Sequence, residues 1–230
     1  MAYTVDRDGF EILPGVLDQP VVTALCEAVA RPESSESVRA RSGVYAIRNL
    51  LAEAPAVREL ARSERLLDFV RPTLGQHARA VKATLFDKRP GANWLVPWHQ
   101  DLTITVQSRR DVPGFGPWTL KAGVVNVQPP ASVLEQVLAL RIHLDDCDCD
   151  NGALRVLPGS HREGRLTAAR IEAWRRGCTE VPCPVPRGGA LLMRPLLLHA
   201  SSPASSPGHR RVIHIEYAAA DLPGGLEWLA

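Results

Sequence analysis

The residues of this sequence best suited to perform chemistry are His99 and Asp101, which lie in the segment Trp98-His99-Gln100-Asp101. On an extended strand, side chains two residues apart point to the same face, so the imidazole and the carboxylate converge while Gln100 points away. Such a pair suits a divalent iron that keeps open coordination positions, provided that a second histidine arrives from elsewhere. His-x-Asp by itself is often a coincidence, so the prediction of a metal depends on that histidine.

The best candidate for the second histidine is His199. It closes an apolar stretch from Leu191 to Leu198 that we expect to be a strand, and it opens the loop Ala200-Ser201-Ser202-Pro203. A histidine at a strand end is often only structural. The context of His199 favours a functional role, because a basic residue, Arg210, follows after a short loop.

Two further segments alternate in a way that predicts a polar interior. In the segment 140–144, Arg141 and His143 lie on the face opposite the apolar residues. In the segment 210–217, one face carries Arg210, Val212, His214 and Glu216, and the other carries Ile213, Ile215 and Tyr217. Such alternation indicates that one side of a sheet meets helices while the other is polar. A buried polar face is costly unless it lines a wet cavity or holds a metal and an anion.

The elements that would position these residues fall into two parts. Residues 1–76 read as mainly helical after a short strand at 8–14, with helices expected to begin near Gln19 and to span 54–61 and 63–74. From about 78 to 220 the chain reads as short strands separated by Gly and Pro, with one helix at 168–176. The expected strands are 80–88, 97–106, 123–127, 133–144, 153–157, 189–198 and 211–218. We therefore predict a mainly β fold, a sandwich or barrel with the N-terminal helices packed on one sheet, as a single domain over 1–230.

Composition excludes several other classes of function. The 230 residues carry a net charge of +2 without a basic block, so charge gives no support to nucleic-acid or membrane binding. We expect no signal peptide and no membrane span. Five cysteines, an odd number, favour reduced thiols and a cytoplasmic location. Cys147-Asp148-Cys149 lacks the spacing of a zinc site, and oligomeric state cannot be inferred from these features.

Four blocks of sequence resemble those of a known family. The longest is the run from Asp150 to His161, DNGALRVLPGSH, and Trp98-His99-Gln100-Asp101-Leu102 lies upstream of it. Downstream, His199-Ala200-Ser201 is followed by Arg210, and the chain opens with Arg7-Asp8-Gly9-Phe10. In this order, over nearly the whole chain, the blocks resemble the phytanoyl-CoA dioxygenase family.

The resemblance implies a double-stranded β-helix, a cupin-like jelly roll, that uses Fe(II), 2-oxoglutarate and O2. His99, Asp101 and His199 would be the catalytic metal ligands. Arg210 would bind the far carboxylate of 2-oxoglutarate, and Ser201, Arg141 and Thr84 are further candidates for cosubstrate contacts. The implied reaction is hydroxylation of a small-molecule substrate with release of succinate and carbon dioxide.

Arg210 and Arg211 are adjacent, so on a strand only one of them can face the interior, and parity with His214 favours Arg210. The roles of Arg48, Lys88, Trp98 and Lys121 stay open, with an exposed basic residue as the simpler interpretation of Lys88. Two other functions also stay open. One is a cupin-like metal-containing binding protein without oxygenase activity, and the other is an inactive chain that serves as a partner module.

Overall fold

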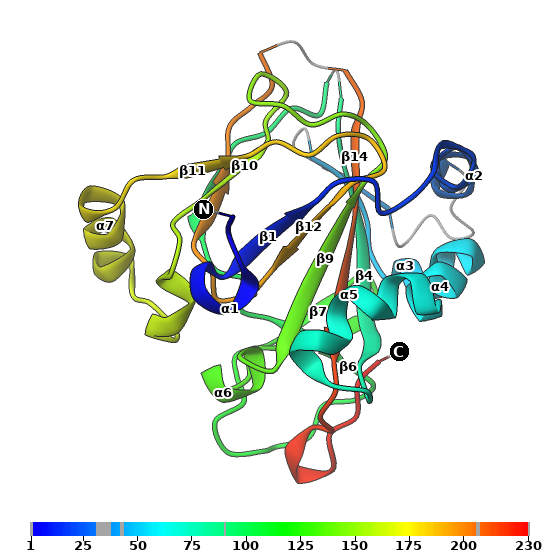
Figure 1. Cartoon of the computed structure of the whole chain (residues 1–230). Coiled ribbons are helices and arrows are strands. Elements are labelled where there is room, and N and C mark those ends of the chain that lie inside the picture. The colour runs from blue at the N-terminus through cyan, green and yellow to red at the C-terminus, as the bar shows by residue number, and fades with distance from the viewer. Residues whose placement is uncertain (1, 31–37, 42–43, 90, 206–207, 230) are drawn as a thin grey trace.

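A computed structural model describes residues 2–30, 38–41, 44–89, 91–205 and 208–229. Its strands form antiparallel sheets that enclose the interior of a jelly roll (Figure 1), which confirms the predicted fold class. The major sheet has the order β1 (Phe10–Leu13), β12 (Ala190–Met193), β9 (Val137–His143), β14 (Arg210–Ala218), β4 (Arg79–Lys88), β3 (Val44–Ile47) and β2 (Val38–Arg41). The minor sheet has the order β11 (Val181–Cys183), β10 (Leu154–Val156), β13 (His199–Ser201) and β5 (Val96–His99). A third, small sheet has the order β6 (Ile104–Val106), β8 (Val124–Val127) and β7 (Trp118–Lys121).

Helices flank these sheets (Figure 1). They are α1 (Val5–Asp8), α2 (Gln19–Ala30), α3 (Leu50–Glu53), α4 (Pro55–Arg62), α5 (Glu64–Leu74), α6 (Ala131–Leu134) and α7 (Ala168–Gly177), with short 3-10 turns at Ser160–Glu163 and Pro223–Gly225. The apolar faces of α2 to α5 share one core with the outer face of the major sheet. None of the helices in the described part of the chain is long and apolar enough to cross a membrane.

Strand β14 separates the helix-packed core from the interior of the barrel. Ile213, Ile215 and Tyr217 are buried in the core shared with the helices, and the Tyr217 hydroxyl donates to the carbonyl of Ala61 in α4 at 3.0 Å. The alternate residues of β14 face the other way, opposite inward-facing residues of β4. The predicted division into an apolar outer face and a polar inner face is therefore present in the structure.

The sequence suggested a single strand over 189–198, but the structure divides this segment. Strand β12 ends at Met193, and the chain turns through Arg194, whose carbonyl accepts a hydrogen bond from the Leu197 N–H. His199 then begins the separate strand β13 in the other sheet. The turn therefore places the histidine in the sheet that carries His99, and not at the end of the strand that precedes it.

Two more segments differ in detail. The predicted strand 133–144 begins instead with α6, because Pro130 serves as the N-cap of a single helical turn before β9 starts at Val137. The predicted strand 97–106 is divided into β5 and β6. The N-terminal part also supplies strands, since β1, β2 and β3 extend both edges of the major sheet.

Candidate metal centre and cosubstrate pocket

Neighbouring strands of the minor sheet bring His99 and His199 together. The two residues are direct partners in the antiparallel register of β5 and β13, and their ring centroids lie 4.2 Å apart. Asp101 follows β5 and is held in place by its backbone N–H, which donates to the Pro195 carbonyl at 2.9 Å. One ligand atom from each of the three residues lies within 4.8 Å of the others.

The hydrogen bonds of the two imidazoles define which nitrogen faces the carboxylate. Nδ1 of His99 lies 2.8 Å from the Pro97 carbonyl, and Nδ1 of His199 lies 2.9 Å from the Leu197 carbonyl. A carbonyl can only accept, so Nδ1 carries the proton and Nε2 keeps a free lone pair. Each Nε2 lies 3.7 Å from an oxygen of Asp101. The three groups therefore present a ready-made set of metal ligands, oriented by backbone carbonyls.

Electrostatics keeps these groups in their ligating forms. Burial lowers the pKa of His199 to about 3 despite the opposing charge of Asp101, so the ring is neutral near pH 7. Burial alone would raise the pKa of the Asp101 carboxyl, but His199, His214, His99 and Lys82 outweigh it and hold the pKa below its usual range. The His199 side chain is only 3% exposed, whereas those of His99 and Asp101 are 37% and 32% exposed toward the cavity. The open side leaves room for further metal ligands.

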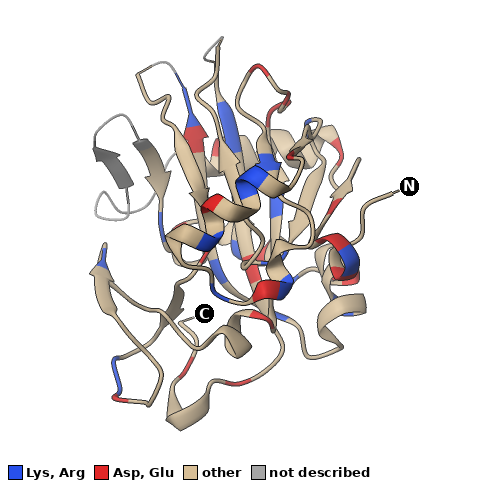
Figure 2. Cartoon of the chain, turned by 90° about the vertical axis from the view of Figure 1, so that its left-hand side faces the viewer, with Lys and Arg blue, Asp and Glu red and all other residues tan. Residues whose placement is uncertain are grey.

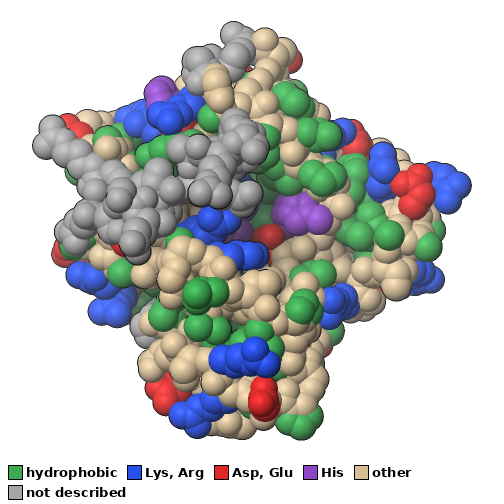
Figure 3. Space-filling view, turned by 180° about the vertical axis from the view of Figure 1, so that it is seen from behind, with side chains coloured by type: hydrophobic (Ala, Val, Ile, Leu, Met, Phe, Trp, Pro, Cys, Tyr) green, Lys and Arg blue, Asp and Glu red, His purple; other side chains and the backbone are tan. Residues whose placement is uncertain are grey.

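A cavity of about 290 Å³ extends from this triad into the barrel. In the space-filling view, histidine and acidic side chains lie in a hollow beside basic ones (Figure 3). Figure 2 shows Lys and Arg residues on several strands as well as on helices and loops. The cavity is thus polar on the inner face of the major sheet, as the alternation predicted.

A chain of polar side chains crosses three strands along one wall of this cavity. Lys82 donates to Glu216 at 2.6 Å, and Nε2 of His214 lies 3.4 Å from the same carboxylate oxygen. Nδ1 of His214 accepts from Arg141 at 2.8 Å. Burial would raise the pKa of Glu216, but Lys82 and His214 more than offset it and keep the carboxylate ionised.

Cationic groups collect at the end of the cavity around Arg210. Arg210 is 4% exposed and donates to the carbonyl of Gly152, while Lys88, its register partner on β4, is 1% exposed. Lys88 donates to Ser201 Oγ at 2.7 Å and to the Ser202 carbonyl. Burial, reinforced by the charge of Arg210, lowers the pKa of Lys88 to about 7. The structure therefore overturns the simpler interpretation of Lys88 as an exposed residue.

This cationic end has unused hydrogen-bonding capacity. The Nε atoms of Arg210 and Arg141 are buried without a partner, and so are both ring nitrogens of His143. Burial, together with Arg210, lowers the pKa of Arg141 to about 10, which leaves it charged near neutral pH. Two buried guanidinium groups with unpaired N–H donors fit a dicarboxylate such as 2-oxoglutarate, since arginine binds carboxylates with parallel charge-assisted hydrogen bonds.

The structure brings all seven predicted site residues into this cavity. Thr84, Arg141, Ser201 and Arg210 line it together with the three candidate metal ligands. Arg211 points out of the cavity and is held by Asp145, which accepts from its Nε at 2.9 Å and its Nη2 at 2.7 Å.

The residues whose roles stayed open divide between two sites. Trp98 lies away from the triad, where its ring stacks with Arg155 at 5.7 Å. Arg48 and Lys121 line an adjoining chamber. Sequence reasoning missed the inward position of Lys82, Phe86 and Lys88 on β4. Parity with Thr84, already a candidate, was the signal that could have identified them.

Gly152 of the DNGALRVLPGSH run has a structural role beside this site. Its φ is +85°, and a Cβ there would lie 2.6 Å from the Ser202 carbonyl and 3.0 Å from Lys88 Nζ. Only glycine lets the loop approach β13 and Lys88 this closely. The run therefore helps to build the cationic end of the cavity.

A family model for phytanoyl-CoA dioxygenase (PhyH) matches residues 5–212. The chain belongs to the phytanoyl-CoA dioxygenase family. Within the match lie the triad and the cationic residues described above, and the family predicted from the four blocks is confirmed.

Two relatives and one solved structure are similar to this family member. A probable alpha-ketoglutarate-dependent hypophosphite dioxygenase of Stutzerimonas stutzeri is 28% identical over 181 residues, which cover 72% of this chain and 54% of the relative. L-proline trans-4-hydroxylase of Streptomyces griseoviridis is 27% identical over 250 residues, which cover 92% of this chain and 82% of the relative. The crystal structure of HygX from Streptomyces hygroscopicus with nickel and 2-oxoglutarate bound has a TM-score of 0.67 at 21% identity. The match covers 94% of this chain and 85% of HygX.

These relatives agree with the predicted cofactor and cosubstrate. Fe(II) and 2-oxoglutarate were expected from the resemblance, and 2-oxoglutarate, also called alpha-ketoglutarate, recurs in the names above. The chain spans about half the length of the hypophosphite dioxygenase and most of the proline hydroxylase. HygX, at its lower identity, shows the shared fold.

Proposed function

We propose that this chain is a non-haem Fe(II)- and 2-oxoglutarate-dependent dioxygenase that hydroxylates a small molecule with release of succinate and carbon dioxide. The observation that carries the proposal is the His99, Asp101 and His199 cluster, open on one side to a cavity that ends in buried cations. The two relatives are named for hypophosphite and L-proline, which supports a small-molecule substrate.

The donor set fits iron. Two imidazoles and one carboxylate with an open side are the protein ligands of many Fe(II) oxygenases, whereas structural metal sites close their coordination with protein ligands. Among the described residues, no fourth His, Cys, Asp or Glu joins the cluster. When bound there, Fe(II) supplies the oxidising chemistry that couples decarboxylation of 2-oxoglutarate by O2 to insertion of oxygen into a C–H bond.

The residues of the chain then have separate tasks. The carbonyls of Pro97 and Leu197 orient the imidazoles, and the ionised Asp101 balances the charge of the metal. Arg210 and Ser201 bind the far carboxylate of 2-oxoglutarate, with Lys88 behind them adding positive charge. Arg141 and Thr84 line the path between that carboxylate and the triad.

The proposal is tested by measuring succinate formed from 2-oxoglutarate with Fe(II) and O2, with and without a candidate substrate. His99→Ala and His199→Ala should each abolish both one-to-one Fe(II) binding and succinate formation while the thermal unfolding temperature stays close to that of the parent. His77→Ala, at an exposed site outside the cavity, is the matched control and should leave both unchanged. One-to-one metal binding without any succinate would favour the alternative of a cupin-like binding protein.

A further inference from the structure

A second chamber opens beside the metal cavity. Its volume is about 190 Å³, and the two spaces share Lys82, Thr84, Phe86 and Asp101 as common walls. The chamber extends from Asp101 to the small sheet, where β7 and β8 contribute Lys121, Val124 and Asn126. A ligand bound in this chamber therefore lies next to the candidate metal ligand Asp101 without occupying the cationic end around Arg210.

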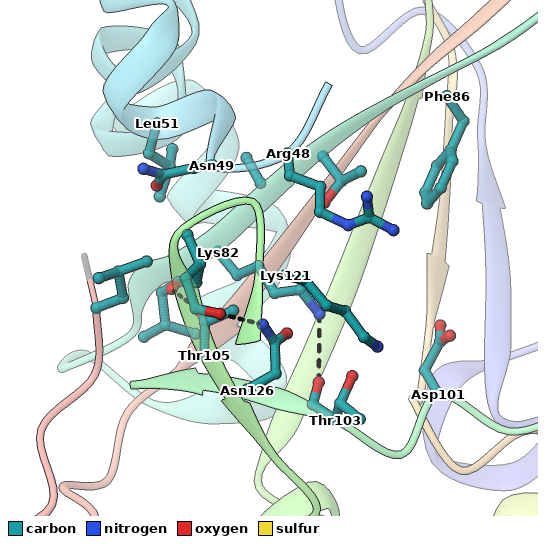
Figure 4. Close-up of a pocket in the computed structure, with 15 residues that line it drawn as sticks. Arg48, Asn49, Leu51, Lys82, Phe86, Asp101, Thr103, Thr105, Lys121 and Asn126 are labelled. Carbon is teal, nitrogen blue, oxygen red and sulfur yellow. Dashed lines mark hydrogen bonds between the residues drawn. The ribbon is translucent and has the colours of Figure 1, made fainter. Parts of the chain in front are cut away.

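The chamber is cationic. Three basic residues, Arg48, Lys82 and Lys121, line it, and Asp101 is the only acidic residue among its described lining residues. Asp101, in turn, is assigned to the metal. Arg48, from the segment before α3, and Lys121, from β7, both line the chamber, as the close-up shows (Figure 4). The net charge of the whole chain is only +2, so this concentration of positive charge is local.

The other lining residues indicate what the uncharged part of an anionic ligand could be. Phe86, Val81, Val124 and Leu229 form apolar walls, and Thr103 and Thr105 add hydroxyl groups. Pockets for drug-sized ligands usually enclose ~300–1,000 Å³, so a chamber of this size suits a smaller molecule. The combination fits a compact, partly apolar body with one acidic group.

We propose that this chamber binds the primary substrate, and that the substrate is a small carboxylate or phosphonate whose anionic group lies between Arg48 and Lys121. The inference rests on the proposed function and names the class of substrate for the same site. The anion anchors the molecule at the small sheet and leaves its apolar body against Phe86, toward Asp101. Cationic compounds such as polyamines are excluded by the same charges.

The test uses probes that share a phenyl ring and carry a substituent of different charge. Benzoate and phenylphosphonate, neutral benzamide, and cationic benzylamine are titrated by calorimetry into the full chain, with and without Ni(II) and 2-oxoglutarate. Nickel replaces iron so that no turnover occurs, and 2-oxoglutarate occupies the cationic end of the metal cavity so that the probes report on the chamber. The anions are expected to bind at least about tenfold more tightly than benzamide, benzylamine more weakly still, with the preference falling at high salt.

Charge-neutralising variants locate the binding. Arg48→Met and Lys121→Met should each weaken benzoate binding about tenfold while leaving the affinity for benzamide and for 2-oxoglutarate unchanged. Lys121→Arg, which keeps the charge, should retain most of the affinity. Arg109→Met removes the same charge from an exposed residue that pairs with Asp111 and does not line the chamber, and it should bind benzoate as the parent does.

The outcomes separate this inference from the proposed function. If 2-oxoglutarate binds normally but benzoate and benzamide bind equally well, or benzylamine binds more tightly than they do, only the assignment of the chamber is overturned. The proposed function would stand. An equal loss in Arg109→Met and Lys121→Met would also overturn the assignment of the chamber, because the effect would then be one of overall charge. Failure of 2-oxoglutarate to bind the Ni(II)-loaded chain would overturn the proposed function and, with it, the role of the chamber as a substrate site.

Discussion

Replacing Arg210 with glutamine should weaken 2-oxoglutarate binding strongly, whereas the same change at Arg211 should not. Arg210 is buried on the inner face of β14, with an unpartnered Nε beside Ser201 and Lys88. Arg211 points to the other face, where Asp145 accepts from its backbone N–H at 2.8 Å and from its guanidinium group. The two neighbours are therefore a matched pair with the same chemistry and opposite orientation.

The expected magnitudes follow from these surroundings. A glutamine amide at 210 cannot make the two parallel charge-assisted hydrogen bonds of a guanidinium group, and their loss costs about 2–4 kcal/mol, or roughly 30- to 1,000-fold in affinity. Arg141 remains charged nearby, which keeps the loss from being larger. Arg211→Gln breaks a partly exposed ion pair, so it should lower the free energy of unfolding by about 1 kcal/mol and change 2-oxoglutarate affinity less than about threefold.

The assay is calorimetric titration of 2-oxoglutarate into the Ni(II)-loaded chain, with chemical denaturation of each variant as the measure of folding. A large loss of affinity in Arg211→Gln with little change in Arg210→Gln would refute the assignment of the inner face of β14. Equal losses in the two variants would mean that the effect is structural and that neither arginine contacts the cosubstrate.

Three further predictions concern Lys88, Gly152 and Tyr217. Because burial lowers the pKa of Lys88 from 10.5 to about 7, the unfolded chain binds more protons than the folded chain between these pH values, so this group makes stability rise with pH. Denaturation midpoints across that range should show a contribution of at most ~1.4 kcal/mol per pH unit that Lys88→Met removes. Gly152→Ala should weaken 2-oxoglutarate binding and lower the melting temperature, because its Cβ meets the Ser202 carbonyl and Lys88; Gly177→Ala, with open space around it, should change neither. Tyr217→Phe leaves the Ala61 carbonyl without its donor and should cost ~1–2 kcal/mol in denaturation with 2-oxoglutarate affinity unchanged. An unchanged midpoint in Tyr217→Phe would show that water replaces the lost donor.

Local pattern predicted the parts of the site that depend on strand parity. The alternation along β14 assigned Arg210 and His214 to the interior and Ile213 to the helix-packed core, and the structure has them there. The two-residue spacing of His99 and Asp101 likewise predicted that they would converge, although Asp101 lies just past the end of β5. Parity is a reliable guide here because a one-residue shift in the register of β14 would turn its apolar side chains toward the cavity and its charged side chains toward the helix-packed core.

Non-local contacts determine what the sequence alone did not reveal. Lys88 looked like an exposed residue at a strand end, but the loop around Gly152 and the segment after Ser201 cover it. His199 was expected to end a strand, and the turn after Met193 starts a new one in the other sheet. The second chamber depends on the small sheet, where the predicted strand segments 97–106 and 123–127 supply β6 and β8, but their pairing with each other and with β7 was not predicted. No local sequence pattern identifies these contacts between segments that lie far apart in the chain.

The most direct test of the central claim is an anaerobic titration of Fe(II) and 2-oxoglutarate into the full chain, followed by visible absorption. A 2-oxo acid that chelates protein-bound Fe(II) gives a charge-transfer band that neither component gives alone. We expect this band to saturate at one equivalent of each, to be lost in His99→Ala and His199→Ala, and to decay when O2 is admitted, with succinate as the product. A band that persists unchanged in His199→Ala, or no band in the parent chain, would contradict the assignment of His99, Asp101 and His199 as the iron site.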